Sequence, residues 1–206
     1  MDYALFVSLV GFSFIAAITP GPNNLLLLSS GALFGLRRTI PHLAGIQLGF
    51  AMLMLASVFG LGGVVTAWPW SLDVIRIIGA SWLVWLSLRF FRAAIQPNRA
   101  GSDSQAAPIS RPFRFVEAFL FQWINPKGII AALSSAGAYI AISDNVWQRA
   151  AILTAVFVSA GTICCSTWMV AGDAMNRYLS SGDSAVWSNG LMGVLIVATA
   201  ALILFG

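Results

Sequence analysis

A short polar stretch inside the first long apolar segment combines helix-breaking residues with amide side chains. Its members are Thr19, Pro20, Gly21, Pro22, Asn23 and Asn24. A proline lacks an amide donor and clashes with the preceding helical turn, so an α-helix cannot run unbroken through this stretch. Inside a bilayer the freed backbone groups find no water, and such a break is tolerated only against protein or a wet cavity. We therefore predict that this stretch forms a binding site.

A second helix breaker lies in a similar place in the other half of the chain. Its polar residues are Gln122, Asn125, Pro126 and Lys127. Interrupted helices at corresponding positions of two halves indicate a transport site near the bilayer midplane. The half-helices that follow Pro20 and Pro126 direct amino-terminal amides to this region, and such ends attract anions. The sequence therefore predicts a site that suits a carboxylate.

Lys127 is the one lysine of the chain and the one basic residue predicted deep in the bilayer. A charge at that depth is costly, so it calls for a wet cavity or an anionic partner. We interpret Lys127 as a counter-charge for a substrate carboxylate, or as the titrating group that couples transport to a proton. The structural alternative is that it snorkels or pairs with Glu117.

Amide side chains crowd the two breaks, and two roles stay open for them. Asn23, Asn24, Gln122 and Asn125 offer hydrogen-bond donors and acceptors to a substrate. They also suit the backbone groups that broken helices leave unpaired. Gln47, midway along the next apolar segment, is a weaker candidate that favours an interhelical hydrogen bond.

Two other polar residues have structural interpretations. His42 follows Pro41 at a predicted segment boundary, which favours interface anchoring over proton relay. Cys164 and Cys165 are adjacent within an apolar run, and no second pair exists for a disulfide framework or a metal site. We predict no cofactor and no bound metal.

The composition indicates a membrane protein. Of the 206 residues, 59% are hydrophobic and 9% are charged, whereas soluble domains carry about 25% charged residues. The net charge of +4 does not indicate nucleic acid, because the arginines are scattered between apolar runs. Six segments reach the length of about 20 residues that a membrane span needs. They cover residues 4–34, 41–65, 72–90, 114–142, 147–172 and 185–205.

Three segments precede and three follow a linker, which predicts an all-α polytopic membrane protein built as an inverted repeat. Pro20 is followed after nine residues by Ser29-Ser30, and Pro126 after eight residues by Ser134-Ser135. The prediction is a single transporter domain with repeats at 1–94 and 114–206, a cytoplasmic linker at 95–113, and broken first and fourth helices.

The arginines predict the orientation, because positive residues mark the cytoplasmic side. One side carries only Arg76 and Arg149. The other carries Arg37, Arg38, Arg89, Arg92, Arg99, Arg111, Arg114 and Arg177. Both termini are therefore expected on the extracytoplasmic side.

With these motifs the chain resembles the lysine exporter (LysE/RhtB) family of amino-acid efflux permeases over nearly its whole length. The motifs are Thr19-Pro20-Gly21-Pro22, the glycines Gly31, Gly35, Gly45 and Gly49, the run at 79–86, Asn125-Pro126-Lys127 and Asn189-Gly190-Leu191-Met192-Gly193. The glycines at four-residue spacing favour close helix contact. The sequence is similar to the cysteine/O-acetylserine exporter branch in Leu28-Ser29-Ser30 and Leu48-Gly49-Phe50. Ser87 and Ala198-Thr199-Ala200 depart from the family at packing glycines.

The resemblance implies a multi-pass exporter of small amino acids or their derivatives in the bacterial inner membrane, driven by proton antiport and not an enzyme. It leaves a homodimer open. The uncharged lining around the breaks favours a small neutral substrate over a cationic one. A metal-ion exporter is the alternative, although the chain offers one histidine and no midplane carboxylate as ligands. An intramembrane enzyme using Cys164 or Cys165 is a third class, in which no catalytic base is evident.

Overall fold

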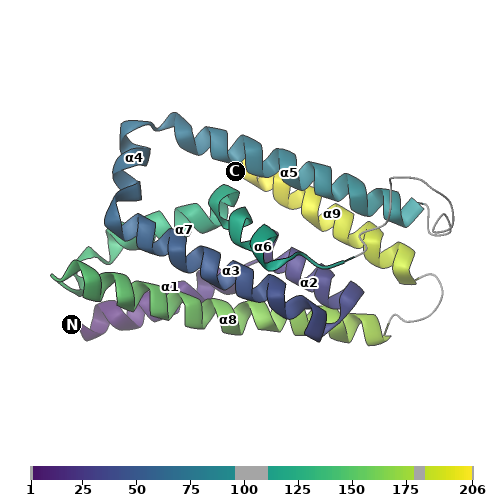
Figure 1. Ribbon diagram of the computed structural model, residues 1–206, viewed down its shortest axis with the longest axis horizontal. Coiled ribbons are helices and arrows are strands. Elements are labelled where there is room, and N and C mark those ends of the chain that lie inside the picture. Colours follow the sequence, from purple (N-terminus) through teal and green to yellow (C-terminus); the bar gives the residue numbers. More distant parts are fainter. Residues whose placement is uncertain (1, 96–110, 179–183, 206) are drawn as a thin grey trace.

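The computed structural model describes residues 2–95, 111–178 and 184–205. Throughout this part the chain forms helices, turns and short connections, and no strand (Figure 1). The helices are α1 (Tyr3–Ile18), α2 (Pro22–Phe34), α3 (Leu36–Ala56), α4 (Gly62–Ala67), α5 (Trp70–Ile95), α6 (Phe115–Phe121), α7 (Pro126–Ala138), α8 (Val146–Tyr178) and α9 (Ser184–Phe205). A π-helical turn covers Ser57–Leu61, and 3-10 turns cover Gln122–Ile124 and Ile140–Ile142.

The apolar helices confirm the membrane class. Three segments are long and apolar enough to cross a bilayer, namely Leu36–Ala67, Trp70–Arg92 and Val146–Met175. The helices Tyr3–Ile18 and Pro22–Phe34 pass the same test when taken together as a bent pair. The shorter apolar helices are Phe115–Ile124 and Gly190–Ala201. Six spans in an inverted repeat therefore stay a prediction.

Both predicted helix breaks are confirmed. The axes of α1 and α2 meet at a bend of 55°, and α2 begins at Pro22 instead of at Pro20 as predicted. Pro22 suits the first helical position because the amide that it lacks has no partner there in any helix. In the second half, Asn125 is extended (φ −87°, ψ 103°), and α7 begins at Pro126 as predicted.

The connection between the first two apolar segments is shorter than predicted. α3 starts five residues before Pro41, so that Gly35 alone separates it from α2. Gly35 has φ 75°, a left-handed conformation that disfavours residues with a side chain. Pro41 lies in the second turn of α3, where it removes one hydrogen bond near the helix start.

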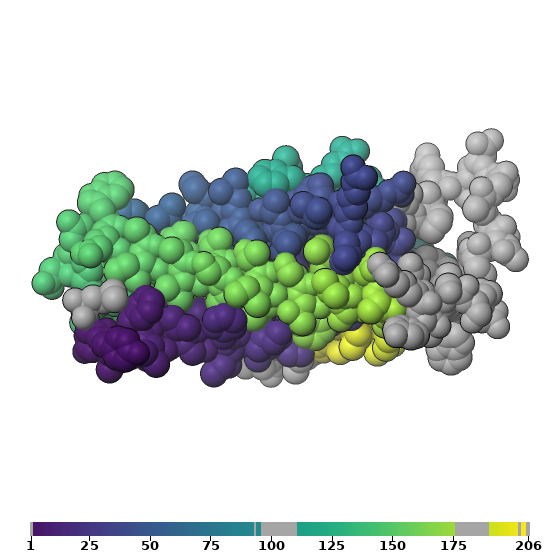
Figure 2. Space-filling model, turned by 90° about the horizontal axis from the view of Figure 1, so that it is seen from below, coloured from purple at the N-terminus to yellow at the C-terminus, as the bar shows by residue number. Residues whose placement is uncertain are grey.

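Helices from the two halves pack across one another. α1 and α2 pack against α8, while α6 and α7 pack against α3, and α5 pairs with α9. Figure 2 shows α8 as a green band between α1 and α3. Gly31 faces the Met169 carbonyl and Gly45 faces the Phe115 carbonyl, at distances that leave no room for a β-carbon. Gly49 likewise lies too close to the Phe119 carbonyl for a β-carbon. The predicted close helix contact is thus confirmed for these three glycines, whereas Gly35 forms the turn described above.

Basic residues gather at one end of the bundle, called here the basic end, where α3 begins and α5 ends (Figure 1). Its described members are Arg37, Arg38, Arg89, Arg92, Arg111 and Arg114. Arg76 lies in the second turn of α5 and Arg149 in the first turn of α8, at the opposite end. Arg99 falls outside the described residues, and the side chain of Arg177 does as well. Which end faces the cytoplasm stays a prediction.

Candidate functional site

The two helix breaks meet at a cavity of about 80 Å³ in the interior of the bundle. The predicted site residues that line it are Gly21, Pro22, Asn23, Asn24, Asn125 and Lys127. α3 contributes Ile46, Gln47 and Phe50, and α8 contributes Phe157, Gly161 and Cys165. Thr19, Pro20, Gln122 and Pro126 do not line the cavity. Ile46 and Phe157 belong to separate apolar clusters, so the cavity lies between two parts of the core.

The first turns of α2 and α7 both border this cavity. Each helix has 13 residues and starts with a proline, after Gly21 and Asn125 respectively. Amides in a first helical turn have no acceptor within their own helix. Two such ends at one cavity create a positive potential without any charged side chain. The arrangement therefore favours an anionic group between the two turns.

Lys127 extends from the first turn of α7 to the end of α1. Its ammonium group donates hydrogen bonds to the Thr19 carbonyl (2.5 Å), the Thr19 hydroxyl (2.9 Å) and the Pro20 carbonyl (3.4 Å). A β-carbon on Gly21 would lie 2.7 Å from Cδ of Lys127, so the lysine stem passes directly over this glycine. Lys127 thus compensates the negative end of α1 by cation contact with its last carbonyls.

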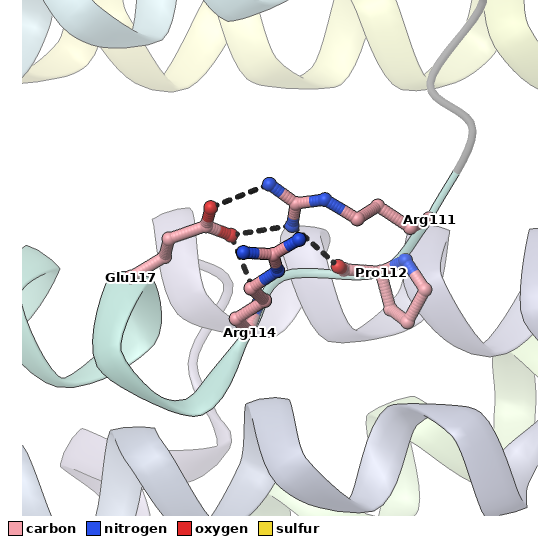
Figure 3. A network of polar contacts seen from close by, with 4 residues as sticks. All are labelled: Arg111, Pro112, Arg114 and Glu117. Atoms are coloured by element: carbon pink, nitrogen blue, oxygen red, sulfur yellow. Dashed lines mark hydrogen bonds and ion pairs between the residues drawn. The ribbon is translucent and has the colours of Figure 1, made fainter.

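The alternative that Lys127 pairs with Glu117 is wrong, because Glu117 has other partners. Both terminal nitrogens of Arg111 donate to its carboxylate, at 2.6 and 2.8 Å (Figure 3). The backbone amide of Arg114 donates to the same carboxylate at 2.9 Å. The hydrogen bonds with Glu117 raise the pKa of the Arg111 guanidinium, which stays charged.

Asn23 and Gln122 join the two breaks through their amide groups. Asn23 donates to Gln122 at 2.7 Å, and Gln122 donates back at 3.2 Å. Gln122 is fully buried and also donates to the Ala118 carbonyl at 2.8 Å. The structural role is therefore favoured for Gln122.

Asn24 likewise satisfies backbone groups of the first break. Its amide donates to the carbonyls of Ala17 and Thr19 at 2.8 and 2.9 Å. The thiol of Cys165 lies 3.5 Å from its carbonyl oxygen. Asn24 thus holds the end of α1 in place beside Lys127. Of its two predicted roles, the structure favours the pairing of backbone groups at the broken helix.

Two buried polar atoms at the cavity lack a hydrogen-bond partner within the described structure. They are Nε2 of Gln47 and Oδ1 of Asn125, and both residues line the cavity. A buried donor or acceptor without a partner is costly and calls for a ligand or water. From its position in the sequence, Gln47 ranked only as a weaker candidate. The available signal was an amide midway along an otherwise apolar span.

His42 lies apart from this cavity, and its predicted interface anchoring is wrong. The residue is 1% exposed, and its Nδ1 lies 3.1 Å from the Ser30 hydroxyl. Its ring stacks on Phe113 with the ring centres 5.2 Å apart. Pro41 lies within α3 and not at its start, so His42 turns inward against α2 and the segment before α6.

The cavity contains no arrangement typical of a metal site or of nucleophilic catalysis. Among the described residues, no three His, Cys, Asp or Glu side chains come together. Cys165 contacts an amide oxygen, and the Cys164 thiol lies 3.9 Å from the Phe14 carbonyl. Both contacts are with carbonyl oxygens and not with a general base.

Comparison with known proteins gives a family and several curated relatives. The family model described as LysE type translocator matches residues 14–206. The leucine efflux protein of Klebsiella pneumoniae is 27% identical over 195 residues, which cover 94% of this chain and 91% of the relative. The cysteine/O-acetylserine efflux protein of Escherichia coli K12 is 30% identical over 169 residues, 81% of each chain. Its Salmonella typhimurium counterpart is 29% identical over the same share. No solved structure matches.

Proposed function

The chain belongs to the LysE type translocator family, and from this premise we propose that it exports a small neutral amino acid or a close derivative. The curated relatives named above are efflux proteins for leucine and for cysteine or O-acetylserine. The observation that carries the proposal for this chain is the cavity between the first turns of α2 and α7. It combines two anion-attracting helix ends, one ammonium group, one unpaired donor and one unpaired acceptor.

These groups match the two charged ends of an amino acid. The substrate carboxylate lies between the helix ends and accepts a hydrogen bond from Nε2 of Gln47. The substrate ammonium group donates to Oδ1 of Asn125. Its side chain extends toward the apolar wall formed by Ile46, Phe50 and Phe157.

The size and charge of the cavity restrict the substrate. Its volume of about 80 Å³ holds several water-sized spheres, each of which takes about 10–15 Å³ on the same measure. This space suits a small side chain. None of the residues that line it is an Asp or Glu, so a cationic side chain would have no counter-charge.

Lys127 connects substrate binding to helix movement in this proposal. A substrate carboxylate competes with the Thr19 and Pro20 oxygens for the ammonium group. Binding therefore weakens the contact between α7 and the end of α1 and permits the two halves to shift. Loss of the Lys127 proton would weaken the same contact, which makes Lys127 the candidate for coupling export to proton antiport.

The membrane arrangement of the proposal is six spans as an inverted 3+3 repeat in the bacterial inner membrane. The packing of each broken helix against the long helix of the other half supports it. The arginines at the basic end support a cytoplasmic position for that end and extracytoplasmic termini. No observation favours the metal-ion alternative.

Counterflow in proteoliposomes tests the function. Labelled alanine, serine, cysteine, leucine and lysine are offered with and without an imposed pH gradient. We expect uptake of at least one small neutral amino acid, accelerated by the gradient, and none of lysine. A preference for lysine, or no uptake of any amino acid by correctly inserted protein, would overturn the proposal.

A further inference from the structure

A second hollow lies between α5 and α6 at the basic end of the bundle, away from the cavity described above. This cleft has a volume of about 620 Å³. Arg89, Arg111 and Glu117 line its polar end. Its apolar wall includes Trp82, Trp85, Leu86, Leu120, Phe121 and Ile124. Arg89 lies seven residues beyond Trp82 on α5, so the two ends of the cleft are roughly 10 Å apart along the bundle.

Among the described residues, one positive charge at the polar end of the cleft has no carboxylate partner. Glu117 is neutralised by Arg111 through two hydrogen bonds (Figure 3). Arg89 is half-buried, and across residues 2–95, 111–178 and 184–205 no carboxylate pairs with it. Its guanidinium lies over the Trp85 ring, 5.2 Å from the ring centre. A partly desolvated arginine held in this way favours a phosphate, which accepts two parallel hydrogen bonds from its planar fork.

The apolar wall opens to the outer surface of the bundle. Trp85 is 51% exposed and Leu120 is 58% exposed. Toward the interior, Trp82 packs on Phe121 with ring centres 4.5 Å apart, which closes the wall. From the basic end inward, the cleft thus changes from cationic to apolar over one or two helical turns.

We propose that this cleft binds an anionic phospholipid of the leaflet at the basic end. Its phosphate contacts Arg89, and one acyl chain lies along Trp82, Leu120 and Ile124. The order of charge and apolar surface matches that of headgroup and acyl chain in a leaflet. A free phosphate would leave the apolar wall bare. A helix from a second copy would cover that wall but leave Arg89 without an anion.

Native mass spectrometry of the delipidated full-length protein tests the proposal. Phosphatidylglycerol, phosphatidylcholine and inorganic phosphate are added separately. We expect phosphatidylglycerol to bind about five- to tenfold more tightly than phosphatidylcholine, and inorganic phosphate not to displace it. Equal binding of the two lipids would overturn the proposal. The proposal would also be overturned if the protein formed a lipid-free dimer in which a second copy covers the cleft.

Substitutions then locate the site. Arg89→Gln should lower phosphatidylglycerol affinity about five- to tenfold. The matched control Arg92→Gln removes a charge from the same helix outside the cleft and should change it little. Leu120→Trp fills the cleft while keeping every charge and should also lower the affinity, whereas Ile130→Trp, on the exposed face of α7, should not. If Arg92→Gln and Arg89→Gln lowered phosphatidylglycerol affinity equally, general surface charge would explain the binding and the proposed site would be wrong.

Discussion

Lys127 on α7 and Thr19 at the end of α1 lie 108 residues apart in sequence and are joined by two hydrogen bonds from one ammonium group. This contact bridges the two halves of the chain beside the cavity, which Lys127 lines. The same ammonium group is the strongest cation available to a substrate carboxylate there. Its partners therefore differ between the empty and the loaded protein in our proposal.

Replacing Lys127 by Met should abolish most transport. A hydrogen bond to a charged group contributes about 1.5–3 kcal/mol, so we expect a roughly ten- to hundredfold loss in counterflow rate. Arg76→Gln serves as the control. It removes a charge at the end of the bundle opposite the basic end, and the variant should transport normally. Transport by Lys127→Met at the rate of the unmodified protein would remove this residue from the mechanism.

Gln47→Leu should weaken substrate binding without destabilising the protein. Its Nε2 has no protein partner in the described structure, and removal of such a donor is neutral or stabilising. The half-saturating concentration should rise about tenfold, because a donor to the carboxylate is lost. The measurements are concentration-dependent counterflow and thermal unfolding in detergent.

Gln122→Leu serves as the comparison, because it should destabilise the protein, whereas Gln47→Leu should weaken substrate binding. Its side chain makes three hydrogen bonds, to Asn23 and to the Ala118 carbonyl. The loss leaves buried groups unpaired, which costs about 1–3 kcal/mol of stability. If both glutamine variants unfolded at the same lowered temperature, Gln47 would be a packing residue.

Gly172→Ala should separate α8 from α2. A β-carbon at Gly172 would collide with the Leu28 carbonyl, a backbone atom that cannot turn away. We expect a loss of about 1–3 kcal/mol in thermal unfolding. Gly11→Ala in α1 meets nothing within 4 Å and should be neutral or slightly stabilising, since alanine favours a helix. Equal behaviour of the two variants would contradict the tight α2–α8 contact.

Substrate should protect Cys165 from thiol reagents. Cys165 lines the cavity, whereas Cys164 does not. In Cys164→Ser protein, a saturating amino acid should slow labelling of Cys165 by a methanethiosulfonate reagent. In Cys165→Ser protein, the labelling of Cys164 should not respond. Unchanged labelling of Cys165 by a transported amino acid would place the substrate elsewhere.

The sequence predicted the features that depend on local backbone chemistry. The two helix breaks follow from the missing amide of proline, although the first new helix begins at Pro22 and not at the predicted Pro20. The close contacts of Gly31, Gly45 and Gly49 follow from four-residue spacing. Features that depend on contacts between residues far apart in the sequence could not be predicted from it. The burial of His42 depends on Phe113, and the partners of Lys127 depend on how two remote helices meet.

The contact between Lys127 and the end of α1 also has a consequence for biosynthesis. When α1 and α2 enter the membrane, the lysine that neutralises the carbonyls of Thr19 and Pro20 has not been made. At about 5–20 residues per second, the ribosome reaches it some 5–20 seconds later. During that interval the amide of Asn24 can donate to the Thr19 carbonyl, but the contact of this helix end with the lysine ammonium group is missing. A nascent chain arrested before Lys127 should therefore be a preferred target of membrane quality-control proteases.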